Sequence, residues 1–215
     1  TEKELARFRQ QSIGFVFQSY NLLPGMTALE NVALPLTFRG MGCRDRGRRA
    51  ERLLDQVGLK DRKKHTPNEM SGGQQQRVGI ARAFVTNPAV VFADEPTGNL
   101  DTHTTKEIMT LFLDFSRQRG TTIILVTHDP VLAGYADRIV TIVDGRVVSD
   151  KPNKSLYDTE HEQASAEKAW EEDRMPAGGL TLGAAEDLQQ DEAADPPSDT
   201  ADKATKQPSM GGTMQ

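Results

Sequence analysis

A short apolar run that ends in two carboxylates constrains the fold of this chain more than any other stretch. Residues 89–96 read Ala-Val-Val-Phe-Ala-Asp-Glu-Pro, and Asn87-Pro88 comes directly before them. The run is too short for a helix and is rich in Val and Phe, so it predicts a buried strand of a parallel sheet. Asp94 and Glu95 would then leave the strand at the carboxyl edge of the sheet, where open α/β folds bind their ligands.

Two adjacent acids at such an edge need a physical reason, because burying an unpaired charge is costly. A hard cation is one reason: Asp94 can hold Mg²⁺, directly or through water, while Glu95 faces a reacting water. A strand end capped by solvated acids is the alternative. The Asp-Glu pair alone does not decide between the two.

Charge and composition exclude several classes of protein. Residues 1–150 hold 20 Lys and Arg against 17 Asp and Glu, whereas residues 151–215 hold 6 against 14. Neither part has the basic excess of a nucleic-acid binder, so we expect no nucleic acid among the partners. The single cysteine, Cys43, excludes an internal disulfide and favours a reducing compartment. No apolar run reaches the roughly 20 residues that cross a bilayer.

Alternating strand and helix patterns predict an α/β sheet with crossover helices. Strands are expected at residues 13–17, 89–94 and 121–126, and a hairpin at 138–143 and 146–149 around Asp144-Gly145. Thr27 and Glu30 have the spacing of a capping box, so a helix should begin there and be distorted by Pro35. A second helix, with apolar residues at helical spacing from position 46 on, should end at Gly58.

A serine and two glycines mark a second functional stretch. Ser71-Gly72-Gly73-Gln74 stands at the start of an expected helix. Free backbone N–H groups and the helix dipole make such a helix start an anion site, most simply for phosphate. An ordinary N-cap is the alternative. The acidic strand end and His128, which follows the next expected strand, favour the anion site.

Five motifs in a fixed order resemble those of an ATP-binding-cassette (ABC) ATPase. They are Gln18 after a strand, Ser71-Gly72-Gly73-Gln74, Val90 to Glu95, Asn99-Leu100-Asp101 and His128. In that family they are the Q-loop, the signature, the Walker B strand with its catalytic glutamate, the D-loop and the switch histidine. The match spans about residues 1–149. Residues 18–24 and 95–101 are similar to the branch with lipoprotein-releasing, macrolide-export and cell-division ATPases.

The resemblance implies an incomplete P-loop NTPase sheet domain of the ABC type with a mostly helical inserted subdomain. Residues 1–18 and 86–150 would form the nucleotide-binding core, and residues 19–85 the helical subdomain with the signature. Residues 151–215 would form an acidic, largely disordered tail, since they hold only four residues from Leu, Ile, Val and Phe. A helix from about Ser155 to Arg174 is the one element expected there, with Tyr157 and Trp170 as docking points.

The resemblance also implies roles for single residues, with ATP and Mg²⁺ as cofactors. Glu95 and His128 would be catalytic, and Asp94 and Gln18 would hold the metal. The nucleotide would contact Gln18, Ser71, Gly72, Gly73, Gln74 and Asp101. Two copies would meet head to tail around two ATP molecules, each signature facing nucleotide carried by the other copy. An integral-membrane permease would be the partner, which places the protein in the cytoplasm, peripherally on the inner face of the cell membrane.

One motif of the family is absent from the sequence. None of the 18 glycines is followed by lysine, so there is no G-x-x-x-x-G-K-[ST] phosphate loop. In the family this loop precedes the Q-loop, so we expect that the amino-terminal part of the nucleotide domain is missing here and that the chain alone has negligible ATPase activity. Met70 also replaces the leucine usual before the signature serine.

Two alternatives stay open. The first is a non-catalytic ABC-like regulatory subunit that has lost its phosphate loop. The second is a chromosome-maintenance ATPase of ABC type, in which long coiled-coil insertions are the rule. Only 52 residues separate Gln18 from Ser71, without sustained heptads, which disfavours the second.

Overall fold

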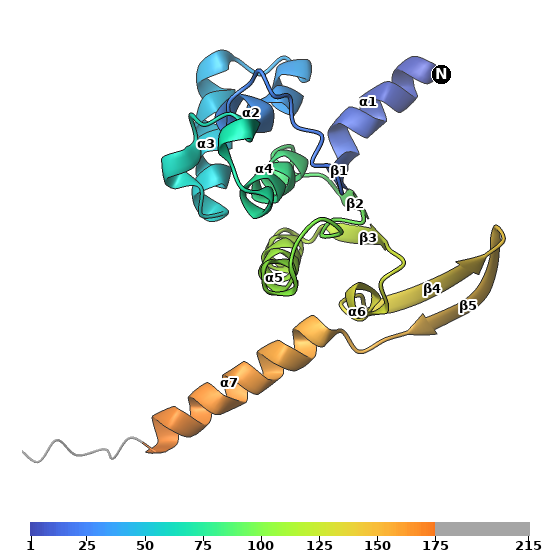
Figure 1. The fold of residues 1–215 in the computed structure, drawn as a ribbon. Helices are drawn as coiled ribbons and strands as arrows, with labels where there is room; N and C mark the ends of the chain where they lie inside the picture. The colour runs from blue at the N-terminus through green and yellow to red at the C-terminus, as the bar shows by residue number, and fades with distance from the viewer. Residues whose placement is uncertain (175–215) are drawn as a thin grey trace, which may run out of the picture. The chain divides into compact units, whose positions relative to one another are not determined.

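A computed structural model of the 215-residue chain describes residues 1–174 (Figure 1). In chain order the elements are α1 (Glu2–Ser12), β1 (Ile13–Phe17), α2 (Ala28–Phe38), α3 (Cys43–Gln56), η1 (Lys60–Arg62), η2 (Pro67–Glu69), α4 (Gly72–Phe84), β2 (Val90–Asp94), α5 (Thr102–Arg119), β3 (Thr122–Val126), α6 (Pro130–Ala133), β4 (Arg138–Val143), β5 (Arg146–Pro152) and α7 (Leu156–Arg174), where η denotes a 3-10 helix. The strands lie within two residues of their expected bounds, except that β5 extends further.

The first three strands form a parallel sheet in the order β1-β2-β3. Residues 18–89 connect β1 to β2 through helices, and α5 connects β2 to β3. The prediction of an α/β fold is confirmed. Within residues 1–174, β3 pairs with β2 alone, and its outer edge carries the exposed side chains of Ile124 and Val126. A cavity of about 450 Å³ lies beside this edge, between α5, β3 and the start of β4.

Helices α2, α3 and α4 pack on one another as one helical body (Figure 1). The expected capping box is confirmed: the Thr27 hydroxyl accepts from the Glu30 backbone N–H, and the Glu30 carboxylate accepts from the Thr27 backbone N–H. The helix continues through Pro35 to Phe38. Gly58, with φ of 75°, follows α3 in the left-handed conformation that glycine adopts at little cost.

Aromatic side chains join the helical body to α5. Phe84 of α4 is fully buried and lies edge-on to Phe112, with ring centroids 5.8 Å apart, and 5.4 Å from Phe115. Ile108, Phe112 and Phe115 of α5 are buried at helical spacing. The hydrophobic core of the described chain therefore runs from α2 and α3 through α4 to α5 and the sheet.

The helix expected from about Ser155 to Arg174 is present as α7, Leu156–Arg174. Strand β5 continues to Pro152, and α7 follows within the same compact unit, which ends at Arg174. Tyr157 is a docking point, as expected: its hydroxyl donates to Asp114 of α5 at 2.6 Å. Arg117 of α5 also donates to Asp158 at 2.9 Å. These polar contacts hold α7, which the low apolar content of the segment did not indicate.

The side chain of Trp170 and residues 175–215 lie outside the described part, and so does most of the tail that the sequence predicts to be disordered. Among the described helices, none is both long and apolar enough to cross a membrane.

The burial of Phe112 gives a test of the core. Phe112→Ala is expected to lower the free energy of unfolding by about 3–5 kcal/mol, because it leaves a cavity against Phe84. Phe38→Ala is the matched control, because the Phe38 side chain is 66% exposed; its cost should stay near 0.5 kcal/mol. Urea unfolding followed by circular dichroism measures both, and equal losses would contradict the position of the core.

Candidate functional site

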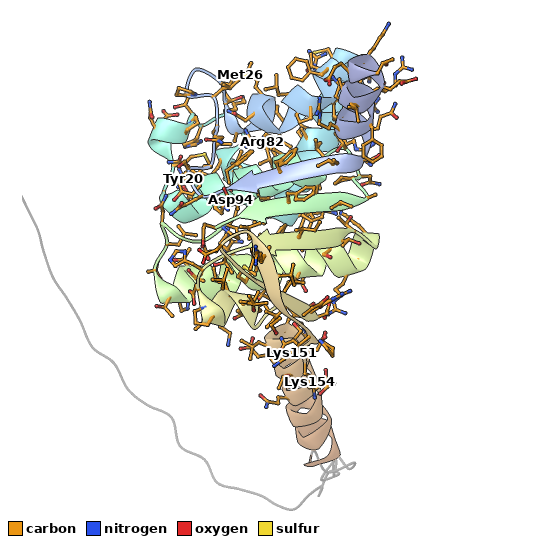
Figure 2. The ribbon with its side chains drawn as sticks, turned by 90° about the vertical axis from the view of Figure 1, so that its right-hand side faces the viewer. Tyr20, Met26, Arg82, Asp94, Lys151 and Lys154 are labelled. Atoms are coloured by element: carbon orange, nitrogen blue, oxygen red, sulfur yellow. The ribbon has the colours of Figure 1, made fainter. Side chains whose placement is uncertain are left out.

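The three parallel strands end level with one another. Phe17 pairs with Asp94, and Asp94 pairs with Val126. The residues that follow, Gln18, Glu95 and Thr127, therefore leave the sheet at one edge. Asp94 lies exposed at this end of the strands (Figure 2). The sheet thus brings together predicted residues from three separate motifs.

Glu95 is held by the segment that follows β3. Its backbone has a positive φ of 43°, a left-handed conformation that costs a residue other than glycine about 1–3 kcal/mol. Its carboxylate Oε1 accepts from the His128 backbone N–H at 2.7 Å and lies 2.6 Å from His128 Nδ1, and Oε2 accepts from the Thr127 hydroxyl at 2.9 Å. These donors hold the carboxylate toward the end of β3.

The hydrogen bonds make Glu95 a weaker base. Burial raises the pKa of its carboxyl group, and 17% of the side chain is exposed. The donors from His128 and Thr127 together outweigh burial, so the pKa lies below the usual value for glutamate. A carboxylate bound by three donors has little capacity left for a water. Releasing one of them would free more of the carboxylate to accept a proton from a water, as a general base does.

The His128 ring is fixed on one side and open on the other. Nδ1 contacts Glu95, while the side chain as a whole is 91% exposed. In a neutral ring, an Nδ1–H group can donate to the Glu95 carboxylate, and Nε2 can then only accept a hydrogen bond. Only the protonated ring can donate from both nitrogens at once. His128 can therefore bind a phosphate oxygen through Nε2 if it is protonated, or after it leaves Glu95.

Asp94 and Gln18 supply oxygen atoms of the kind that Mg²⁺ prefers. Both residues are exposed at the strand ends, and no side-chain hydrogen bond occupies Asp94 in the described part of the chain. Within residues 1–174 no cluster of three or more His, Cys, Asp or Glu side chains could hold a metal ion. Mg²⁺ is commonly held by one or two carboxylates together with waters and substrate phosphates, so the pair fits as a partial ligand set.

The predicted anion-binding helix start is formed by α4. Ser71 is its N-cap, with a capping box in which the Ser71 backbone N–H donates to Gln74 Oε1 at 3.1 Å. A Cβ atom at Gly72 would lie 2.8 Å from the Tyr20 hydroxyl oxygen, and one at Gly73 would lie 2.8 Å from Thr104 Cγ2. The glycines thus allow close packing against two other segments. Ser71 itself is exposed.

Asp101 is the N-cap of α5. Its carboxylate accepts from the Thr104 backbone N–H at 3.0 Å and from the Thr104 hydroxyl at 2.6 Å. The Thr104 hydroxyl and backbone hydrogen bonds lower the pKa of Asp101. Asp101 thus lies near Gly73, with Thr104 between them. Within one chain the predicted residues form two groups, one at the strand ends and one at the starts of α4 and α5.

A loop between these two groups is held by residues that the sequence analysis did not single out. Tyr20 and Asn21 have positive φ values of 60° and 47°. Arg82 of α4 donates to the carbonyl of Asn21 at 2.5 Å and to that of Tyr20 at 2.8 Å (Figure 2). Asn31 is fully buried, and its side-chain amide accepts a hydrogen bond from the Leu23 backbone N–H and donates one to the Leu23 carbonyl.

The sequence contained a signal for Asn31. The residue lies among Ala28, Val32 and Leu36, on the buried face of α2. A polar side chain at an apolar position of a helix has to find partners, since burying it without hydrogen bonds is costly. Its partners are backbone groups of the preceding loop, which a periodicity pattern does not identify.

Comparisons with known proteins identify the family of this chain. A family model described as ABC transporter matches residues 1–98. A macrolide export ATP-binding/permease protein of Marinobacter nauticus is 56% identical over 147 residues, which are 68% of this chain and 23% of that protein. A lipoprotein-releasing system ATP-binding protein of Bacteroides fragilis is 49% identical over 68% of both chains. This chain thus spans between about a quarter and two thirds of these relatives.

The fold also matches solved structures. The dimeric structure of a post-hydrolysis state of the ATP-binding cassette MJ0796, bound to ADP and Pi, is similar with a TM-score of 0.64. The two sequences are 42% identical, and the match covers 73% of this chain and 69% of that one.

The lowered pKa of Glu95 predicts a pH dependence of stability. Its ionised form stabilises the fold fully above the pKa of an unfolded glutamate, and this contribution is lost as the pH falls through the lower folded pKa. Between about pH 7 and pH 3, wild type should therefore lose more unfolding free energy than Glu95→Gln. Urea titrations at each pH measure the difference, and a constant offset between the two curves would contradict it.

Proposed function

Because this chain belongs to the ABC transporter family of ATP-binding proteins, we propose that it is part of an ATP-hydrolysing subunit that powers a membrane transporter. The proposal rests on the common edge of the sheet. Gln18 and Glu95 follow neighbouring strands at this edge, and Asp94 is the last residue of β2. His128 contacts Glu95. Side-chain oxygen acceptors and one histidine held close together suit phosphoryl transfer. This reaction depends on positioning the reactants and neutralising their charge more than on covalent catalysis.

In the proposed reaction Glu95 polarises a water that attacks the γ-phosphate of ATP. Its carboxylate first leaves the donors of the segment after β3, since it is bound by His128 and Thr127. The released His128 ring then turns to the γ-phosphate. Asp94 and Gln18 would hold Mg²⁺, which neutralises charge on the phosphate oxygens when bound. The arrival of nucleotide thus changes the partners of Glu95 and His128 together.

The second group of residues supports a dimer. Ser71 is exposed at the start of α4, and no contact joins it to Glu95 within the described chain. A helix start with free N–H groups binds anions. We therefore propose that the start of α4 in one copy binds the γ-phosphate of ATP held at the strand ends of a second copy. The binding residues would be Ser71, Gly72, Gly73 and Gln74. Asp101, beside this helix start, would connect the two composite sites.

A permease with membrane-spanning helices is the proposed partner, and this places the subunit at the inner face of the cell membrane. An apolar groove of about 350 Å³ lies between α1, β1, α2 and α4, and Phe15 and Phe38 line it. The loop after Gln18 adds Leu23, which is 44% exposed, whereas Leu22 packs against the core. We propose that a cytoplasmic helix of the permease binds along this groove.

A non-catalytic regulatory subunit is the competing function. It would have no need for a carboxylate placed beside an open histidine, which the contact between Glu95 and His128 provides. The phosphate-loop lysine of the family does not occur within these 215 residues. Activity tests are therefore made on the full-length protein.

Removing the proposed base separates binding from hydrolysis. Glu95→Gln in the full-length protein should leave ATP affinity within about threefold of wild type and lower kcat by two to three orders of magnitude. Equilibrium binding of labelled ATP and phosphate release measure the two quantities. Normal turnover by this variant would remove Glu95 from the role of base and favour the competing function.

The Glu95→Gln variant also tests the head-to-tail dimer. Without hydrolysis, ATP that bridges two copies should stabilise the dimer by mass action, which light scattering detects. Adding Ser71→Phe should return the protein to monomers at the same ATP concentration, because a bulky ring blocks the helix start. Ser165→Phe, on the exposed face of α7, is the matched control and should leave the dimer intact. A dimer that persists with Ser71→Phe would exclude this interface.

A further inference from the structure

The loop between β2 and α5 holds Gln18 in place through a hydrogen bond. The Asn99 side chain donates from Nδ2 to the carbonyl oxygen of Gln18 at 3.1 Å. The two residues are 81 positions apart in sequence, and each is exposed. Water could replace a hydrogen bond at such a place, so this one adds little to the stability of the fold. What it does fix is the position of Gln18 relative to the loop that carries Asp101.

Gly98 provides the space that the Gln18 side chain occupies. A Cβ atom at Gly98 would lie 2.7 Å from Gln18 Nε2 and 3.2 Å from its Cδ. The Gly98 backbone is not in the left-handed region, so its φ does not require glycine. A Cβ atom there would instead require the flexible end of the Gln18 side chain to move. The Gln18 side chain therefore lies directly over the backbone of the 97–101 loop.

The rest of the loop after Gln18 is held by other elements. Arg82 of α4 binds the carbonyls of Tyr20 and Asn21, and Asn31 of α2 binds Leu23. These bonds make the segment from Tyr20 onward part of the helical body. Gln18 lies where the helical body meets the sheet, and Asn99 ties it to the sheet side.

We propose that Asn99 and Gly98 are positioning residues for Gln18 in ATP hydrolysis. The inference rests on the proposed function, because it takes Gln18 as a ligand of the metal or the attacking water. Asn99 holds the Gln18 backbone, and Gly98 lets its amide lie against the 97–101 loop. A shift of Asp101 at the dimer contact is then transmitted to Gln18 through two residues of the same loop.

Two substitutions disturb Gln18 in different ways. Asn99→Asp keeps the shape but sets a carboxylate against the Gln18 carbonyl, and Gly98→Ala displaces the Gln18 amide. In the full-length protein each should lower kcat about three- to tenfold, with little change in KM for ATP or in melting temperature. The matched control is Asn87→Asp, which makes the same change of charge and can still accept from Arg119. Its kcat should equal that of wild type.

A double-mutant cycle with Gln18→Ala decides whether the two residues act through Gln18. In the Gln18→Ala background, Asn99→Asp and Gly98→Ala should each change kcat by less than about twofold, because the side-chain amide through which both residues would act is gone. Effects that add to that of Gln18→Ala, or that are absent in wild type, would overturn the inference while leaving ATP hydrolysis established. A full-length wild type without ATPase activity would instead overturn the proposed function, and the inference with it.

Discussion

The backbone hydrogen bonds between β1, β2 and β3 are the constraint on which the site depends. They join segments that are far apart in sequence, and they do so in one register, with Phe17, Asp94 and Val126 side by side. A parallel strand whose register slipped by one residue would turn its side chains to the other face of the sheet. Gln18, Glu95 and Thr127 would then no longer leave the sheet at the same place. The apolar strands thus specify where the polar chemistry lies.

The helical body depends on that sheet through a few polar side chains rather than through apolar packing alone. Arg82 and Asn31 satisfy backbone groups of the loop after β1, and Arg39 binds the carbonyls of Gln10, Gln11 and Thr86. Buried or half-buried polar groups of this kind are costly to leave unpaired, so they favour one arrangement of the loop. These hydrogen bonds join α4 to the loop after Gln18.

The sequence predicted the strands, the capped helices and the association of the motifs with strand ends and helix starts, because each rests on local patterns. It could not predict what lies opposite each residue. The hydrogen bonds of Glu95 come from a segment more than thirty positions away, and its lowered pKa follows from them. Composition likewise did not indicate which contacts hold α7. Helix α7 is held by Tyr157 and Asp158 against α5, through polar contacts that an apolar count does not register.

The outer edge of β3 has a consequence for the behaviour of this polypeptide in solution. Within residues 1–174 its backbone N–H and carbonyl groups on that side face no other strand, and Ile124 and Val126 are exposed beside them. An uncovered, apolar strand edge is a template to which extended segments of other molecules add, as in domain swapping and amyloid growth. The chain shields this edge with neither a proline nor a lysine in β3. This edge is therefore one place, among the described residues, at which molecules can begin to associate at high protein concentration.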